Sequence, residues 1–188
     1  MNDGSGSYNR FLSGDRDAID EVIRDYKDGL IYYIYSIIGD MDQAEEAAID
    51  VFVKLYVDKP VFKGDSAFKT WLYKIGRNKA YDIKRKLSKT DEVPLDDAYY
   101  VSSGENIEQN YIQQEEGTML RKTLSRLKPE YCQILCLIYF ENFDNSEAGK
   151  IMKKSSKQIR DLLYRAKNAL KRELEKEGAE YEKLPRNS

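Results

Sequence analysis

The sequence predicts an all-α protein made of two small helical domains that a flexible acidic linker joins. Apolar residues recur with the spacing of a helix in two blocks, and the residues between the blocks lose that periodicity. In the second block, two helix-start signatures follow each other closely, as a helix-turn-helix requires. We therefore expect domains at residues 10–87 and 115–176, a linker at 88–114 and a charged tail at 177–188.

Composition excludes several classes of protein. Charged residues make up 34% of the 188 residues, and no apolar run approaches the roughly 18 residues that span a bilayer. The first residues also lack the apolar core of a signal peptide. We therefore expect a cytoplasmic protein without membrane insertion.

The sequence offers little for catalysis or metal binding. It has no histidine, and it shows no convergent set of nucleophile, base or metal ligands, so we expect neither an enzyme nor a cofactor. Cys132 and Cys136 lie four residues apart in an apolar run. Two thiolates alone make a poor metal site, so we expect these side chains to pack in a core.

The net charge of −2 conceals two cationic patches. Seven basic residues stand against one acid in residues 68–86, a net charge of +6, and eight stand against one acid in residues 153–172, a net charge of +7. Eight acids and no base lie between Asp91 and Glu116. Because patches rather than totals set the affinity for phosphates, this distribution favours nucleic-acid binding.

The first domain begins with two helical stretches. Residues 1–13 are polar and glycine-rich at first, so we expect a frayed end. Residues 15–39 have helical spacing, either as one bent helix or as two that break at Gly29. Residues 40–58 follow with an acidic outer face, although acids near a helix start also complement the helix dipole without any further function. Their core stripe consists of Ala44, Ala48, Val51 and Leu55.

Residues 68–86 predict an amphipathic basic helix. Its apolar positions form one stripe, and the rest of its surface is cationic. A solvated amphipathic helix is the plain alternative for a pattern of this kind. The apolar positions are Phe68, Trp71, Leu72, Ile75, Ala80 and Ile83.

The second domain ends in a predicted helix-turn-helix. Asp144 with Glu147, and Ser155 with Gln158, are each N-terminal capping signatures. Gly149 lies in the first helix of the pair, where a residue without a side chain lets the second helix cross closely. In a helix-turn-helix the start of the second helix enters the major groove of DNA.

A longer match extends from the turn before the basic helix into the helix itself. Residues 62–78 resemble the promoter-melting region of bacterial RNA polymerase sigma factors of the small extracytoplasmic-function (ECF), sigma-70-like family. The resemblance implies that residues 10–87 form sigma region 2 and residues 115–176 form sigma region 4. The matching residues are Phe62, Lys63, Gly64, Phe68, Lys69, Thr70, Trp71, Leu72, Tyr73, Lys74, Arg77 and Asn78.

The resemblance implies roles for several of these residues in recognising the promoter minus-10 element. The loop at residues 59–67 would cup a flipped-out base, and the following helix would hold the non-template strand. We assign Trp71 and Leu72 to the core because they lie on the apolar stripe. The residues implied for minus-10 DNA are Phe62, Lys63, Lys69, Thr70, Arg77 and Asn78.

The acidic helix resembles the family's polymerase-binding helix, which docks on the clamp helices of the beta-prime subunit. Ile49 stands where the family usually has Gln, which either replaces a hydrogen bond with an apolar contact or reflects a different local register. The residues implied for core-polymerase binding are Asp42, Glu45, Glu46, Ile49, Asp50 and Phe52.

The helix-turn-helix resembles the family's minus-35 reader, but with more departures, at Lys153, Lys154, Ser156, Asp161 and Leu162. Asp161 could only accept a hydrogen bond from a cytosine amino group or brace a neighbouring arginine, so a promoter sequence cannot be carried over. The residues implied for minus-35 DNA are Lys157, Gln158, Arg160, Asp161, Tyr164, Arg165 and Lys167.

The resemblance implies a sigma factor that directs RNA polymerase core enzyme to promoters and starts transcription by binding the minus-35 duplex and the melted minus-10 strand. The implied partners are the polymerase core, through its beta-prime clamp helices and beta flap, promoter DNA and an anti-sigma factor. Two other interpretations stay open. One is a helix-turn-helix transcriptional regulator that is not a polymerase subunit, and the other is a helical adaptor that binds only protein.

Overall fold

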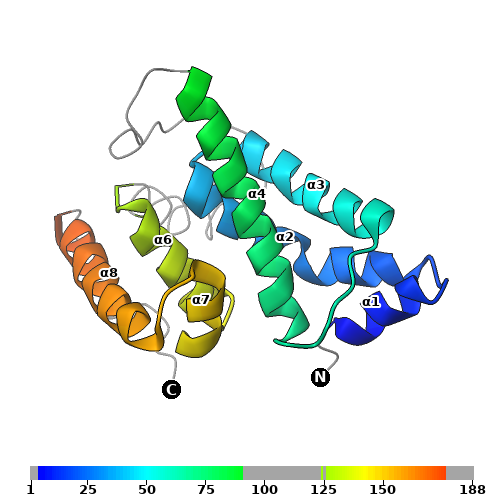
Figure 1. Cartoon of the computed structure of the whole chain (residues 1–188). Coiled ribbons are helices and arrows are strands. Elements are labelled where there is room, and N and C mark those ends of the chain that lie inside the picture. The colour runs from blue at the N-terminus through cyan, green and yellow to red at the C-terminus, as the bar shows by residue number, and fades with distance from the viewer. Residues whose placement is uncertain (1–3, 91–123, 125, 177–188) are drawn as a thin grey trace, which may run out of the picture.

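The computed structural model describes residues 4–90, 124 and 126–176, and within these residues all regular structure is helical (Figure 1). The all-α prediction is confirmed. Most of the predicted linker and the predicted tail lie outside the described residues. The elements are α1 (Ser5–Leu12), α2 (Ala18–Ile38), α3 (Met41–Asp58), α4 (Phe68–Thr90), α6 (Pro129–Leu135), the π-helix η1 (Cys136–Phe140), α7 (Asn145–Met152) and α8 (Ser156–Lys176). We call α1 to α4 the N-terminal bundle, and α6 to α8 with η1 the C-terminal unit.

The beginning of the chain forms a packed helix, so the expectation of a frayed end through Ser13 is wrong for residues 5–12. Tyr8 and Phe11 are buried, because residues three apart share one face of a helix. The Tyr8 ring lies 5.4 Å from the Phe68 ring, and its hydroxyl donates a hydrogen bond of 2.8 Å to the carbonyl of Pro60. Tyr8 therefore anchors α1 on α4 through its ring and on the loop before α4 through its hydroxyl.

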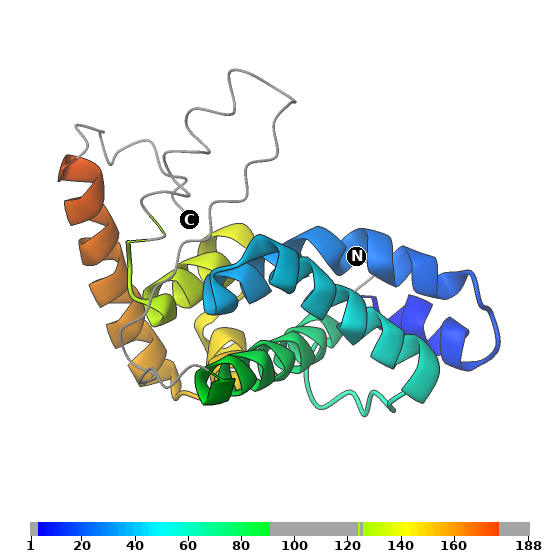
Figure 2. The same ribbon diagram turned by 90° about the horizontal axis from the view of Figure 1, so that it is seen from above.

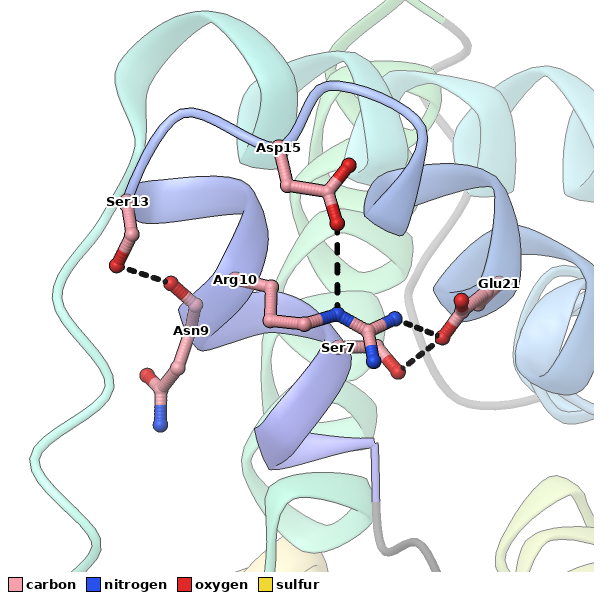
Figure 3. A network of polar contacts seen from close by, with 6 residues as sticks. All are labelled: Ser7, Asn9, Arg10, Ser13, Asp15 and Glu21. Carbon is pink, nitrogen blue, oxygen red and sulfur yellow. Dashed lines mark hydrogen bonds and ion pairs between the residues drawn. The ribbon is translucent and has the colours of Figure 1, made fainter.

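Polar contacts fix α1 against the start of α2 (Figure 3). Arg10 forms ion pairs with Asp15 at 3.5 Å and with Glu21 at 2.5 Å, and the Ser7 hydroxyl donates to Glu21 at 2.6 Å. The hydrogen bonds from Ser7 and Arg10 lower the pKa of the Glu21 carboxyl. These contacts hold the turn between the two helices in one geometry.

Of the two alternatives for residues 15–39, the structure has a single helix, α2, which runs through Gly29 without a break. It ends at Gly39, whose φ of 84° is the left-handed conformation that glycine adopts at helix C-termini. In α3, Asp40 caps the N-terminus by accepting a hydrogen bond of 2.9 Å from the amide of Gln43. The predicted core stripe of α3 is buried in full, together with Ala47 and Phe52.

The basic helix extends beyond its predicted end, to Thr90. Phe68, Leu72 and Ala80 are fully buried, while Trp71 is partly buried against the aromatic rings of α1 and the preceding loop. Tyr73, which we did not place in the core, is buried as well, on the side of α4 that faces the C-terminal unit. This helix therefore buries side chains toward both halves of the chain.

Both predicted capping signatures form in the C-terminal unit. Asp144 accepts from the amide of Glu147 at 2.8 Å and donates its own amide to the Glu147 carboxylate at 3.0 Å. Ser155 and Gln158 exchange the same pair of hydrogen bonds at 3.2 and 2.8 Å. The two caps start α7 and α8, and these helices form the predicted helix-turn-helix.

The crossing of α7 and α8 requires Gly149, as predicted. A Cβ at this position would lie 2.6 Å from the backbone carbonyl oxygen of Lys154, a separation that real Cβ atoms essentially never show. Lys153 ends α7 with a φ of 57°, so a residue with a side chain takes the left-handed conformation that favours glycine. The two cysteines are buried, as expected.

The two halves of the chain pack directly on each other (Figures 1 and 2). In this arrangement α7 contacts α4, while α6 and η1 contact α2. The last helix, α8, lies on the outer side of the C-terminal unit, away from α1. Among the described residues, none of the helices combines the length and the apolar character needed to cross a membrane.

Candidate nucleic-acid and polymerase interfaces

The outer face of α3 presents five of the six residues predicted for polymerase binding. Asp42, Glu45, Glu46, Ile49 and Asp50 are exposed, whereas Phe52 is only 5% exposed and points into the core. Phe52 is therefore set apart from the other five by the rotation of the helix, since it lies on the same side as the core stripe.

An apolar stripe runs beside these acids. Ile49, Val53 and Val57 follow one another at four-residue spacing, and their exposed fractions are 54%, 50% and 67%. Val53 and Val57 were not among the predicted residues, although their spacing from Ile49 is the signal that places them on one face. The face combines acidic residues with exposed apolar surface, a composition that suits a protein partner better than a nucleic acid.

The loop before α4 packs its aromatic residue into a ring cluster. Phe62 is partly buried and meets Phe68 edge-on, with ring centroids 5.5 Å apart and an interplanar angle of 86°. The Trp71 ring lies 5.4 Å from Phe62 and 5.5 Å from Phe68, so the three rings contact one another. Lys63 and Gly64 are exposed, and the φ of Gly64 is 77°. This loop therefore presents two lysines, Lys59 and Lys63, and the rim of an aromatic cluster to solvent.

The side chains of Lys69 and Thr70 face the C-terminal unit. The Lys69 ammonium lies 2.8 Å from Oε2 of Glu141, donates to the Glu141 carbonyl at 2.8 Å, and sits 4.9 Å from the centroid of the Phe143 ring. Thr70 is fully buried, and its hydroxyl is 3.4 Å from Oε1 of Glu147. Two of the six residues predicted for minus-10 DNA therefore contact the other half of the chain, which leaves Thr70 fully buried and the Lys69 side chain 31% exposed.

Glu141 is the centre of this contact. Its side chain is only 12% exposed, and besides Lys69 it accepts a hydrogen bond of 2.5 Å from the hydroxyl of Tyr73. Burial raises the pKa of Tyr73, and the neighbouring Glu141 carboxylate raises it further. A carboxylate with a cation and a phenol as partners satisfies the requirement that buried charges be paired and hydrogen-bonded.

Arg77 is partly buried within the N-terminal bundle, and Asn78 is not. The Arg77 guanidinium stacks on the Tyr81 ring at 4.4 Å, and its Nε is buried with no hydrogen-bond partner among the described residues. Next to it, Gln133 of α6 is fully buried and donates to the Tyr81 hydroxyl at 3.2 Å. Asn78 is exposed. Of the six predicted minus-10 residues, Lys63 and Asn78 are exposed, and Phe62 and Arg77 are partly buried within the N-terminal bundle. Lys69 and Thr70 contact the C-terminal unit.

Most of the residues predicted for minus-35 DNA form an exposed face on α8. Tyr164 is 70% exposed, and Lys157, Arg160, Asp161 and Arg165 are exposed as well. Gln158 is exposed but uses its side chain in the helix cap, while Lys167 is partly buried and lies 5.3 Å from the Tyr139 ring. The structure thus brings five of the seven residues together on one accessible surface.

The backbone carbonyl of Asp161 accepts from Nε of Arg165 at 3.2 Å. The contact is made by the backbone and not by the carboxylate, so the structure does not pair the Asp161 side chain with this arginine. The Asp161 carboxylate stays on the exposed surface of α8.

The contact between the two halves was not predicted from the sequence. Tyr73, Glu141, Phe143 and Glu147 carry it. Tyr73 gave a weak signal, because it is a large aromatic residue off the apolar stripe of α4. The other three lie in the second half of the sequence, and no local pattern relates them to α4.

Comparison with known proteins agrees with this architecture. Residues 22–90, which cover most of the N-terminal bundle, match the family model for sigma-70 region 2. The chain is 26% identical over 172 residues to the ECF RNA polymerase sigma factor SigW of Bacillus subtilis, covering 86% of this chain and 91% of that protein. It is 29% identical over 155 residues to the ECF sigma factor SigM of the same organism, covering 82% and 93%.

Solved structures show the same fold. The sigma factor RpoE of Bartonella quintana, in complex with the anti-sigma factor NepR, matches with a TM-score of 0.69 and 22% identity, over 85% of this chain and 98% of that one. CnrH in complex with the cytosolic domain of CnrY matches with a TM-score of 0.66 and 19% identity, over 90% and 96%. The fold and the region 2 match define a sigma-70-like protein. Over most of its length the chain is also similar to extracytoplasmic-function RNA polymerase sigma factors.

Proposed function

We propose that this chain is an extracytoplasmic-function sigma factor, which directs RNA polymerase core enzyme to promoters. It would bind the minus-35 duplex with α8, and the melted minus-10 strand with the loop before α4 and the start of α4. The exposed face of α8 is the observation that carries the proposal. Lys157, Arg160, Asp161 and Tyr164 follow one another at helical spacing on the second helix of a capped helix-turn-helix. This is the part of such a motif that reaches base edges in the major groove.

The minus-10 strand would be held by the cations and rings around the start of α4. Lys63 and Asn78 are accessible, and Phe62 offers an aromatic rim for an unstacked base. A single strand needs cationic contacts along its phosphates and aromatic contacts with its bases, and this surface offers both. Lys69 and Thr70 would join them once the C-terminal unit moves away.

Polymerase would bind the outer face of α3. Asp42, Glu45, Glu46 and Asp50 supply charges there, and Ile49 supplies an apolar contact at the centre of the face. We infer that the clamp helices of the beta-prime subunit dock on this face and that the C-terminal unit contacts the beta flap. The related RpoE structure holds an anti-sigma factor, so we further infer an anti-sigma partner for this protein. We also infer that the protein is cytoplasmic.

A second candidate, a helix-turn-helix regulator that is not a polymerase subunit, has one observation in its favour. In this structure the α8 face is accessible, whereas Lys69 and Thr70 are covered. Such a regulator would bind duplex DNA with α8 and would not need these two residues.

Run-off transcription separates the two candidates. Core polymerase from the bacterium that carries the gene is given fragments of that genome, with and without this chain. We expect new discrete transcript starts that share upstream sequence. An Asp42→Lys, Glu45→Lys, Glu46→Lys variant should lose polymerase binding and transcription while keeping its affinity for duplex DNA. If the wild-type chain yields no new starts from a polymerase that is active with another sigma factor, the regulator is the better description.

A further inference from the structure

The contact between the two halves of the chain covers a site that the proposed function needs. Lys69 and Thr70 belong to the minus-10 set, and both are covered by residues of the C-terminal unit. A contact that controls access to this site regulates the proposed function, so its regulatory role rests on that function.

The C-terminal unit offers Lys69 the same chemistry that a DNA strand would offer. The Glu141 carboxylate supplies anionic oxygen at 2.8 Å from the ammonium, in the manner of a phosphate. The Phe143 ring lies 4.9 Å from the same ammonium and 5.0 Å from the Tyr73 ring, where a base could stack. One lysine and one tyrosine cannot hold both a strand and these two side chains.

We propose that Glu141 and Phe143 form an intramolecular mask that competes with single-stranded DNA, so that the free protein rests in a closed state and the minus-10 site opens only when the two halves separate. Interfaces between domains of one chain are usually mobile. The affinity of the free protein for a strand is then reduced in proportion to the fraction that is open.

Gly29 gives the mask a steric requirement that is independent of charge. A Cβ at this position of α2 would lie 2.5 Å from Oε1 of Glu141 and 2.5 Å from the Tyr73 hydroxyl. Glu141 therefore reaches Tyr73 only because position 29 has no side chain. Gly29→Ala should displace the Glu141 carboxylate, and the substitution also favours the helical backbone of α2.

Fluorescence anisotropy with a labelled thymidine 20-mer tests the mask on the full chain without polymerase. Glu141→Ala and Gly29→Ala should each bind the strand about five-fold tighter than wild type, or more, since a closed state that dominates by this ratio lowers affinity by the same ratio. Adding Lys69→Ala to either variant should remove the gain. Small-angle X-ray scattering should show a larger radius of gyration for both variants.

Each variant has a matched control. Glu130→Ala removes the same charge from the C-terminal unit, but Glu130 pairs with Lys154 at 3.1 Å, within that unit. Gly76→Ala adds the same methyl group to the N-terminal bundle, where it would lie 2.6 Å from Leu30 Cδ1 and strain only the bundle itself. Both controls should bind the 20-mer within about two-fold of wild type, because they leave the population of the closed state unchanged.

Two results would overturn the mask. One is that Glu141→Ala and Gly29→Ala bind no tighter than wild type, and the other is that Glu130→Ala gains as much as Glu141→Ala, which would reduce the effect to net charge. The run-off assay reports on the proposed function separately. If the wild-type chain fails there while the two variants still bind the strand more tightly than their controls, the sigma role is rejected and the mask is retained.

Discussion

The ammonium of Lys69 and the carboxylate of Glu141 lie 2.8 Å apart, although 72 residues of sequence separate them and they belong to different halves of the chain. Lys69 is one of the residues that match the promoter-binding motif of sigma factors. Glu141 directly follows η1 in the C-terminal unit. The ion pair therefore links the candidate DNA-binding site of the N-terminal bundle to the C-terminal unit. Because the pair is partly buried, removing one partner would leave the other charge without its counter-ion, which costs more than breaking an ion pair on the surface.

A double-mutant cycle on Lys69→Ala and Glu141→Ala should show a coupling of about 1 kcal/mol or more in the free energy of unfolding, because the two side chains are in direct and partly buried contact. Urea denaturation of the wild type, both single variants and the double variant measures it. Lys79 and Asp50 form the matched control, since they also pair across two elements, at 2.5 Å, but are more exposed. Their coupling should stay near about 0.5 kcal/mol. Equal coupling in both pairs would contradict the special position of Glu141.

Gly149→Ala should destabilise the C-terminal unit by about 1–3 kcal/mol, since the added methyl group meets the rigid backbone carbonyl of Lys154 at 2.6 Å. The midpoint temperature of thermal unfolding and the affinity for duplex DNA should both fall. Ser146→Ala is the control, because Ser146 lies on the exposed side of the same helix and its substitution should change stability by no more than about 0.5 kcal/mol. A Gly149→Ala variant as stable as wild type would mean that α7 and α8 can move apart without loss.

Lys153→Gly should stabilise the protein by about 0.5–1 kcal/mol, because a side chain makes the left-handed conformation costly whereas glycine adopts it freely. Lys153 ends α7 in that conformation, at a φ of 57°. Lys153→Ala removes the same charge but keeps the strain, so it should bring no gain. Thermal unfolding of the two variants distinguishes strain from charge, and a gain of equal size in both would contradict the explanation.

Four features of the fold could be predicted from the sequence, because each is determined by local rules. The caps at Asp144 and Ser155, the stop at Gly39 and the close crossing at Gly149 all follow from the preferences of single residues over one or two turns. The structure shows all four.

The arrangement of the candidate site could be predicted only in part. The α8 face follows from helical periodicity, and so does most of the α3 face. The masking of Lys69 by Glu141 depends on how the two halves dock, which no local pattern determines. In the first half, Tyr73 and Gly29 are the residues whose chemistry reflects this contact. The packing of α1 was missed because Tyr8 and Phe11 are only two apolar residues in a polar stretch.

The stability of the N-terminal bundle should fall as the pH rises above about 10. Burial raises the pKa of the Tyr8 hydroxyl to about 12 from its ordinary value of 10.0. The folded state then holds a proton that the unfolded state has lost, so the contribution of Tyr8 is complete below pH 10 and is lost as the pH rises toward 12.

Tyr8→Phe tests this dependence. The variant should lose about 1 kcal/mol at pH 7, because the hydrogen bond to Pro60 is gone. Between pH 9 and 11 its free energy of unfolding should fall less steeply than that of the wild type, so the two curves approach each other. Curves that stay parallel over this range would show that Tyr8 does not titrate there.

Lys157→Ala should weaken duplex binding about equally for all sequences, and it should reduce the slope of log affinity against log salt by about 1, as the loss of one phosphate contact does. Lys157 lies at the exposed start of α8, the end that enters the groove in a helix-turn-helix. Lys176→Ala is the control at the far end of the same helix, where Lys176 pairs with Glu173 at 2.6 Å, and its salt slope should match that of the wild type.

Arg160→Ala, one turn further along from Lys157, should instead change which sequences are preferred, because side chains at this depth reach base edges. Anisotropy titrations at several salt concentrations, on the promoter found by run-off transcription and on a scrambled duplex, separate the two effects. A Lys157→Ala variant whose salt slope equals that of the wild type would place the DNA on another face of α8.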